Sequence, residues 1–124
     1  MNLGEAYFWH EHLWIVVTLP DDKSKAVVVV NVSTWHVSKD HACVVEPGEH
    51  PWIRTKSVIM YSFARALNVG EQEDFTQGSI RQSDASQTLV DRIQEQAEES
   101  EFTSQHIVAM IRASAKKQRA TKRR

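Results

Sequence analysis

Four consecutive valines, at positions 27–30, constrain the fold of this chain more than any other feature. Valine is branched at Cβ and restricted at χ1, so a run of four favours an extended strand over a helix. Successive side chains of a strand point to opposite faces, so this run needs apolar neighbours on both faces. The sequence therefore predicts a central strand here, in a core that extends over residues 25–67.

Short runs of β-branched and aromatic residues surround the valine strand. Residues 11–19 predict the strand before it, and the turn-forming residues 20–24 between the two indicate an antiparallel hairpin. Residues 42–45 and 57–61 predict two later strands. Residues 3–9 form either a lead-in strand or an aromatic plug over the end of a barrel.

The second half of the chain has a different pattern. Residues 63–67 fit either a helical turn or a continued strand, and residues 71–82 lack apolar periodicity and predict a surface loop or the end of a hairpin. Two helices are expected after them. The first has Ser83 or Asp84 as its N-cap and an apolar stripe; the second starts at Thr103 or Ser104 and has its own stripe. The two stripes are Leu89, Val90, Ile93 and Ala97, and Ile107, Met110 and Ile111.

Strands followed by two helices predict an α+β fold, a small curled antiparallel sheet with helices on one side. With 124 residues and 41% hydrophobic content, residues 1–115 are expected to form one domain, with a barrel over 5–67 and a helical extension over 83–115. No apolar run approaches the roughly 18 residues that span a bilayer, and no secretion signal is recognised. The single cysteine, Cys43, indicates a reducing compartment. We expect a cytoplasmic protein with no membrane contact.

Charge is distributed unevenly along the chain. Residues 116–124 hold six of the 15 basic residues and no acid, which leaves nine basic and 16 acidic residues in 1–115, a formal charge of −7. A basic tail on an acidic body can attract nucleic acid or another acidic surface. The alternative is a disordered, solvated terminus that aids solubility.

The loop between the last two predicted strands is dense in polar and aromatic residues. His50 is a candidate general acid or base, and Arg54 and Lys56 are candidates to hold a phosphate. Trp52 can stack on a base and Ser57 can donate a hydrogen bond. The alternatives are structural: Trp52 as a core plug, His50 bonded to the backbone, and the two cations on a solvated strand face.

Histidines and the cysteine raise the possibility of a metal centre or a thiol nucleophile. Five of the six histidines, at 10, 12, 36, 41 and 50, lie in the first fifty residues, where Cys43 or Glu11 can complete a set of ligands. No standard metal-binding spacing is present, so no metal or other cofactor is expected. Cys43 lies between apolar residues and is expected to be buried and inert.

The segments VVVVNVS at 27–33, ACVVEPG at 42–48 and SVIMYSFARAL at 57–67 resemble the MazF/PemK-like family. Members of that family are toxin-type endoribonucleases of toxin–antitoxin systems, with an SH3-like barrel that cuts single-stranded RNA. HLW at 12–14 and GEHPWIR at 48–54, the distinctive part, look like a divergent bacterial branch. The resemblance covers roughly residues 10–67. It implies metal-independent cleavage, an antitoxin or other protein partner, and a homodimer.

The resemblance also implies positions for RNA contacts. The family usually has an arginine before the valine-rich strand, and Lys25 stands there in this sequence, a point charge instead of a bidentate fork. The hydroxyl that follows the next strand in the family has no counterpart in residues 47–50. Ser33 and Thr34, at the end of the valine strand, are candidates to line an RNA groove or are ordinary turn formers.

Two classes of function follow from these observations. The chain is either a metal-independent endoribonuclease that uses His50, Arg54 and Lys56, or a non-catalytic module that binds RNA or a protein, as part of a toxin–antitoxin-like or larger assembly. Lys25, Ser33, Thr34, Trp52 and Ser57 are the expected RNA contacts in the first class.

Overall fold

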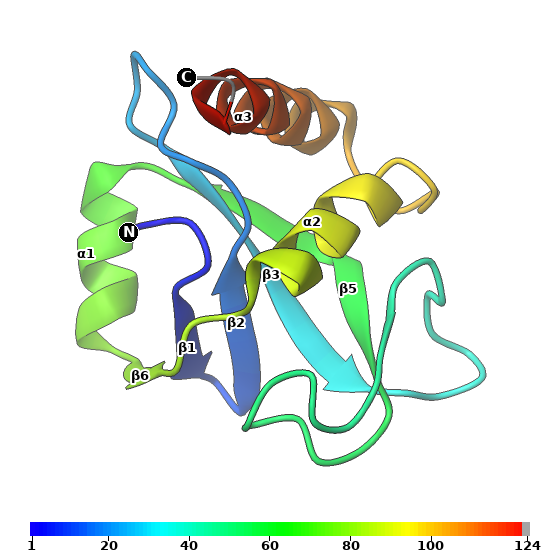
Figure 1. The fold of residues 1–124 in the computed structure, drawn as a ribbon. Coiled ribbons are helices and arrows are strands. Elements are labelled where there is room, and N and C mark those ends of the chain that lie inside the picture. Colours follow the sequence, from blue (N-terminus) through cyan, green and yellow to red (C-terminus); the bar gives the residue numbers. More distant parts are fainter. Residues whose placement is uncertain (123–124) are drawn as a thin grey trace.

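A computed structural model describes residues 1–122 of the chain (Figure 1). Over these residues it contains six strands and three helices: β1 (Ala6–Trp9), β2 (His12–Val16), β3 (Val27–Thr34), β4 (Val44–Val45), β5 (Ser57–Leu67), α1 (Val69–Gln77), β6 (Ile80–Gln82), α2 (Gln87–Gln96) and α3 (Gln105–Lys122). The strands form one curled antiparallel sheet in the order β4-β5-β3-β2-β1-β6. The predicted α+β class, a curled antiparallel sheet followed by two C-terminal helices, is confirmed.

The valine run is the centre of the sheet, as its residue types predict. Val28 and Val30 point into the core covered by α2 and α3, whereas Val27 and Val29 point to the opposite face. All four valine side chains are fully buried. The strand therefore has apolar neighbours on both faces.

The face of the sheet opposite α2 and α3 has its own small core beneath α1. Phe75 of α1 packs against Tyr7, Trp9 and Trp14, with ring centroids 5.9, 4.7 and 5.9 Å away. Phe75 is the only hydrophobic residue of this helix that is buried. That is why the segment shows no helical periodicity in the sequence.

The prediction of a surface loop or hairpin end over residues 71–82 therefore misses a helix. The segment forms α1 and then β6, which adds an edge strand next to β1. A capping box starts α1: the Asn68 side chain accepts from the Glu71 amide at 2.8 Å, and the Glu71 carboxylate accepts from the Asn68 amide at 3.0 Å. Residues 63–67, which fitted two states, continue β5, with Leu67 paired to Val27.

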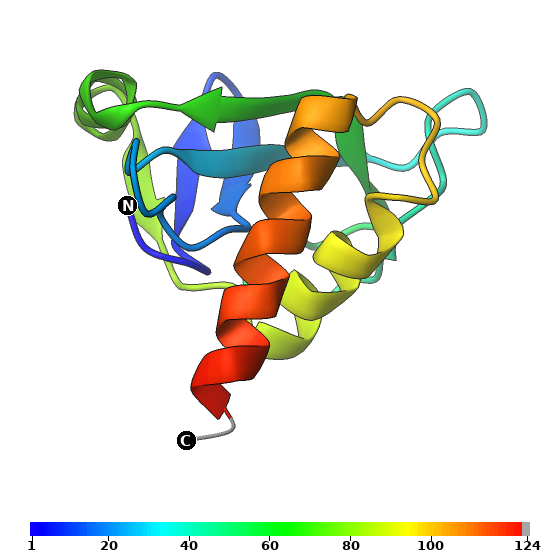
Figure 2. The same cartoon turned by 90° about the horizontal axis from the view of Figure 1, so that it is seen from above.

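Helices α2 and α3 lie side by side across the inner face of the sheet (Figure 2). Their predicted apolar stripes are confirmed, because Leu89, Ile93, Ala97, Ile107 and Ile111 are all buried in the main core. The N-cap of α2 is Ser86, and not Ser83 or Asp84. The Ser104 hydroxyl accepts from the Ile107 amide at the start of α3.

The basic tail begins as the last turns of the final helix. Helix α3 continues to Lys122, so residues 116–122 are helical; residues 123 and 124 lie outside the described part of the chain. Alanine, lysine, glutamine and arginine are strong helix formers, which favours this extension. The Lys117 ammonium also donates to the Pro20 carbonyl at 2.8 Å and to Asp22 at 3.0 Å.

Candidate functional site

A polar groove lies at the end of the sheet where β3 finishes and β5 begins. It has a volume of about 290 Å³. Its walls come from the β1–β2 turn, the end of β3 and the loop that leads into β5. Eleven residues line it: Glu11, His12, Val32, Ser33, Thr34, Lys39, Trp52, Ile53, Arg54, Thr55 and Ser57.

The groove brings together five of the eight residues that the sequence singles out. Ser33, Thr34, Trp52, Arg54 and Ser57 all line it. The pairing of Thr34 with Ser57, and of Ser33 with Val58, places the end of β3 beside the start of β5. Residues that lie more than twenty positions apart in the sequence therefore share one wall.

Two cations reach the groove. Arg54 is exposed and makes no ion pair or side-chain hydrogen bond within residues 1–122, so its fork of donors is available to an anion. The Lys39 ammonium donates to the Ser33 hydroxyl at 2.8 Å and to the Thr34 carbonyl at 2.7 Å. These two bonds fix the position of the second charge and leave one N–H donor unused.

Trp52 separates this groove from a second hollow. Its ring packs on Phe8 with centroids 5.6 Å apart and remains 37% exposed. The second hollow, of about 400 Å³, is lined by Pro51, Trp52, Arg54 and Gln82. Trp52 and Arg54 line both hollows. The groove and the second hollow are therefore neighbours on the surface, and together they offer a longer binding surface than either hollow alone.

His12 also lines the groove. The sequence predicts no RNA-binding or catalytic role for it, only a place among the possible metal ligands. Its Nδ1 lies 3.3 Å from the Val32 carbonyl oxygen. A carbonyl only accepts, so Nδ1 carries the proton and Nε2 is the lone-pair nitrogen. Within residues 1–122 no hydrogen-bond partner is found for Nε2. His12 therefore lines the groove with a ring nitrogen that, in the neutral imidazole, has a lone pair and no partner among the described residues.

The turn before His12 is strained. Strands β1 and β2 are joined by two residues, because Trp9 pairs with His12. Both turn residues have positive φ, 46° at His10 and 64° at Glu11. Such two-residue turns favour asparagine and glycine, and other residues in this conformation cost free energy. The sequence signal that points to His12 is the pair His10-Glu11, which stands between two aromatic strands at the tip of their hairpin.

His50 does not reach the groove. It is 2% exposed, its Nε2–H donates to the Ser83 carbonyl at 2.6 Å, and its Nδ1 accepts from the Trp52 amide at 3.0 Å. Both ring nitrogens are therefore occupied. His50 is thus bonded to the backbone, which is the structural alternative stated for it from the sequence. In this arrangement neither ring nitrogen is free for acid–base chemistry.

Lys56 and Lys25 also lie away from the groove. The Lys56 ammonium sits 4.9 Å from the ring centroid of Trp35, which stacks on His41. Lys25 lies in the β2–β3 hairpin with a φ of 62°. Ser33 lies eight positions further along the chain, about 25 Å away at the usual rise of a strand.

The remaining histidines and Cys43 do not form a cluster of metal ligands in the described part of the chain. Within residues 1–122, no three His, Cys, Asp or Glu side chains are placed to hold a metal ion. Cys43 is 2% exposed, and burial raises the pKa of its thiol. A buried, protonated thiol is a poor nucleophile.

Comparison of the chain with protein-family models, with curated proteins and with solved structures finds no match. Among the described residues, no helix has the length and apolar character needed to cross a membrane.

Proposed function

We propose that this protein binds single-stranded RNA along the groove and cleaves it without a metal ion. The observation that carries the proposal is the convergence of Arg54, Lys39, Trp52 and His12 around one groove. Cations that hold phosphate beside an exposed aromatic ring are the usual parts of a single-strand site. These residue types support RNA binding in the groove independently of the resemblance to the MazF/PemK-like family.

The path past Trp52 favours a polymer over a small ligand. The groove and its neighbouring hollow share Trp52 and Arg54. A phosphate held at Arg54 leaves room for a nucleotide on each side, and a base can stack on the exposed part of the Trp52 ring. A duplex keeps its bases stacked on one another, so this arrangement suits an unpaired strand.

His12 supplies the acid–base group that the predicted His50 cannot supply. Its Nε2 takes the proton from a ribose 2′-OH, and the 2′-oxygen forms a bond to the adjacent phosphorus. The bond from phosphorus to the 5′-oxygen breaks, and that oxygen takes a proton from water. Arg54 and Lys39 stabilise the charge on the phosphoryl oxygens. The products are a 2′,3′-cyclic phosphate and a 5′-hydroxyl.

We further propose that the curled sheet is a divergent SH3-like barrel of the MazF/PemK type. The support is the valine-rich strand at its centre and the return strand that carries GEHPWIR into the groove wall. In this assignment the basic contact before the valine strand is replaced by Arg54, because Lys25 lies at the far end of the sheet.

The test is incubation of a long single-stranded RNA with the wild type, His12→Ala, Arg54→Ala and His106→Ala, with EDTA present. His106 is an exposed histidine of α3 and serves as the matched control. We expect cutting that leaves cyclic phosphate ends, is lost in the first two variants and persists in the third. DNA of the same sequence lacks the 2′-OH and should be bound but not cut.

A non-catalytic RNA-binding module is the second candidate. One observation favours it: the two serine hydroxyls of the groove are engaged internally, with Ser33 accepting from Lys39 and Ser57 donating to the Thr55 carbonyl at 2.9 Å. Binding of RNA by a wild type that never cuts it would select this function. A wild type that neither binds nor cuts RNA would contradict both.

A further inference from the structure

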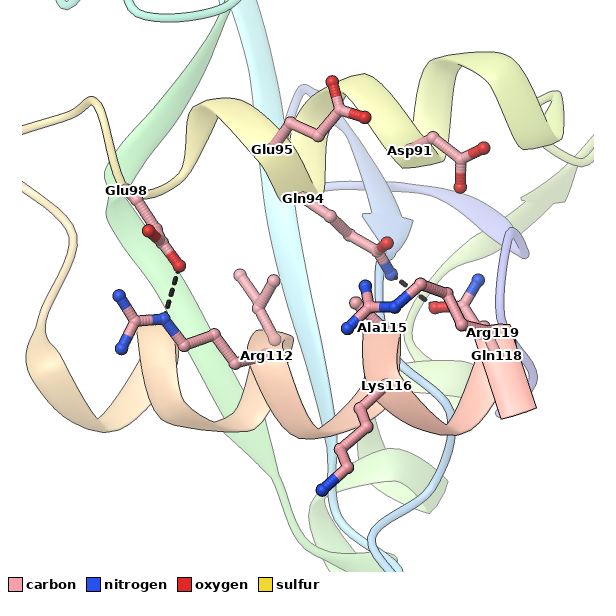
Figure 3. Close-up of a pocket in the computed structure, with 10 residues that line it drawn as sticks. Asp91, Gln94, Glu95, Glu98, Arg112, Ala115, Lys116, Gln118 and Arg119 are labelled. Carbon is pink, nitrogen blue, oxygen red and sulfur yellow. Dashed lines mark hydrogen bonds and ion pairs between the residues drawn. The ribbon is translucent and has the colours of Figure 1, made fainter. Parts of the chain in front are cut away.

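A cleft of about 640 Å³ lies between α2 and α3 and is larger than the polar groove. No residue lines both. Figure 3 shows the side chains that line the cleft on its two sides, with Glu98 reaching Arg112 and Gln94 reaching Gln118 across it. Its floor contains Ile111, Ala115 and the pair Gln94 and Gln118, which are joined by a hydrogen bond of 2.8 Å.

The two walls of this cleft carry opposite charges. Asp91 and Glu95 project from α2 and Glu98 from the turn that follows it, and Arg112, Lys116 and Arg119 project from α3. The three cations have the spacing i, i+4, i+7, which puts them on one face of α3. We call the two sets the acidic ridge and the basic ridge.

The ridges are matched in level along the cleft. Glu98 and Arg112 form an ion pair at one end, and Asp91 and Arg119 lie at the other end (Figure 3). Glu95 and Lys116 occupy the middle. Apart from Glu98 and Arg112, no ridge residue makes an ion pair with a side chain of residues 1–121. Among these described side chains, four of the six charges therefore have no partner of opposite sign.

We propose that this cleft is the interface of a symmetric dimer, and that its occupant is a second copy of the chain. A two-fold axis along the cleft, in the plane of contact, places α2 of each copy opposite α3 of the other at the same level. Each acidic ridge then faces a basic ridge. The unpaired Glu95 meets Lys116 of the second copy, and Asp91 meets Arg119 of the second copy, twice in each dimer.

The charge pattern selects this occupant. A surface with one acidic and one basic ridge is complementary to itself under that rotation, whereas a partner with a single sign of charge is repelled by one of the two ridges. The buried Ile111 and the small Ala115 on the floor allow close approach of the two copies. The proposal does not depend on RNA binding.

The test is sedimentation equilibrium of the full chain over a concentration series, for the wild type, Glu95→Lys and Lys116→Glu. Each single reversal sets like charges against each other at two places in the dimer. We expect the dissociation constant of each variant to rise by about tenfold or more, and that of the wild type to rise with salt. Glu73→Lys and Lys23→Glu make the same charge changes at exposed positions outside the cleft and should leave association unchanged.

An equimolar mixture of Glu95→Lys and Lys116→Glu gives the sharpest result. In the mixed dimer the reversed charges face each other with opposite signs, so association should return to near the wild-type level. Isotopic labelling of one variant distinguishes the mixed dimer by mass spectrometry. This recovery also shows that both variants fold. A monomeric wild type, or a dimer that neither reversal weakens, would overturn the proposal.

Discussion

His50 donates its Nε2–H to the carbonyl oxygen of Ser83, 2.6 Å away and 33 positions later in the chain. This bond ties the loop that forms the groove wall to the segment that leads into α2. Since Trp52 donates its amide to the other ring nitrogen, the imidazole also fixes the position of the tryptophan ring. His50 is therefore a positioning residue for the groove.

Replacing His50 should destabilise the fold. His50→Ala leaves the Ser83 carbonyl and the Trp52 amide without their partner and opens a cavity, so we expect a loss of about 2–4 kcal/mol in the free energy of unfolding. Chemical denaturation measures this change. His106→Ala, at an exposed position, should change the free energy by less than about 0.5 kcal/mol. Equal stabilities for the two variants would show that the buried bonds of His50 contribute little.

Relief of the strained turn before His12 should increase the stability of the protein, whereas replacement of His50 should decrease it. The double variant His10→Asn/Glu11→Gly supplies residues that accept positive φ, so it should stabilise the protein by about 1–2 kcal/mol. Thermal unfolding measures the gain. If the strain serves the groove, the variant should bind RNA more weakly while unfolding at a higher temperature. A lower unfolding temperature would show that the turn is not strained.

The pair Glu49 and Arg92 gives a pH-dependent contribution to stability. The Arg92 guanidinium, 2.8 Å from the carboxylate, holds the pKa of Glu49 below its ordinary value. A carboxylate with a depressed folded pKa stabilises the protein above its unfolded pKa, and this contribution is lost as the pH falls through the folded pKa. Glu49→Gln should therefore be less stable than the wild type at pH 7.

Both partners of this pair are partly exposed, so solvent screening limits the difference at pH 7 to about 1 kcal/mol or less. The difference should start to shrink at about pH 4, where the unfolded glutamate becomes protonated, and vanish only below the lower pKa of the folded protein, where the folded carboxylate is protonated as well. Urea unfolding at several pH values tests this. A difference that is constant over the whole range would contradict an electrostatic origin.

The sequence predicts the parts of this fold that depend on local pattern. Val27–Val30, the return strand and the two apolar helix stripes are each specified by residues close together in the chain. Helix α1 is not predicted from the sequence, because Phe75 is its one buried hydrophobic residue and no apolar stripe results. Asn68 and Glu71 do have the spacing of a capping box.

The candidate site is predicted less completely, because its side chains depend on distant partners. Arg54 and Lys56 are two residues apart, yet one lines the groove and the other lies over Trp35. His12 and His50 differ in role because their ring nitrogens meet the carbonyls of Val32 and Ser83, twenty and 33 positions away. Composition and spacing do not encode these pairings.

The measurement that tests the central claim most directly is the salt dependence of binding to a fluorescent single-stranded RNA, for Arg54→Gln and Lys25→Gln. Each variant removes one positive charge, but only Arg54 lines the groove. We predict that Arg54→Gln weakens binding and lowers the slope of log K against log salt by about 0.7, the loss of one phosphate contact on a single strand. Lys25→Gln should leave both unchanged. Equal effects of the two substitutions, or none from Arg54→Gln, would contradict RNA binding in this groove.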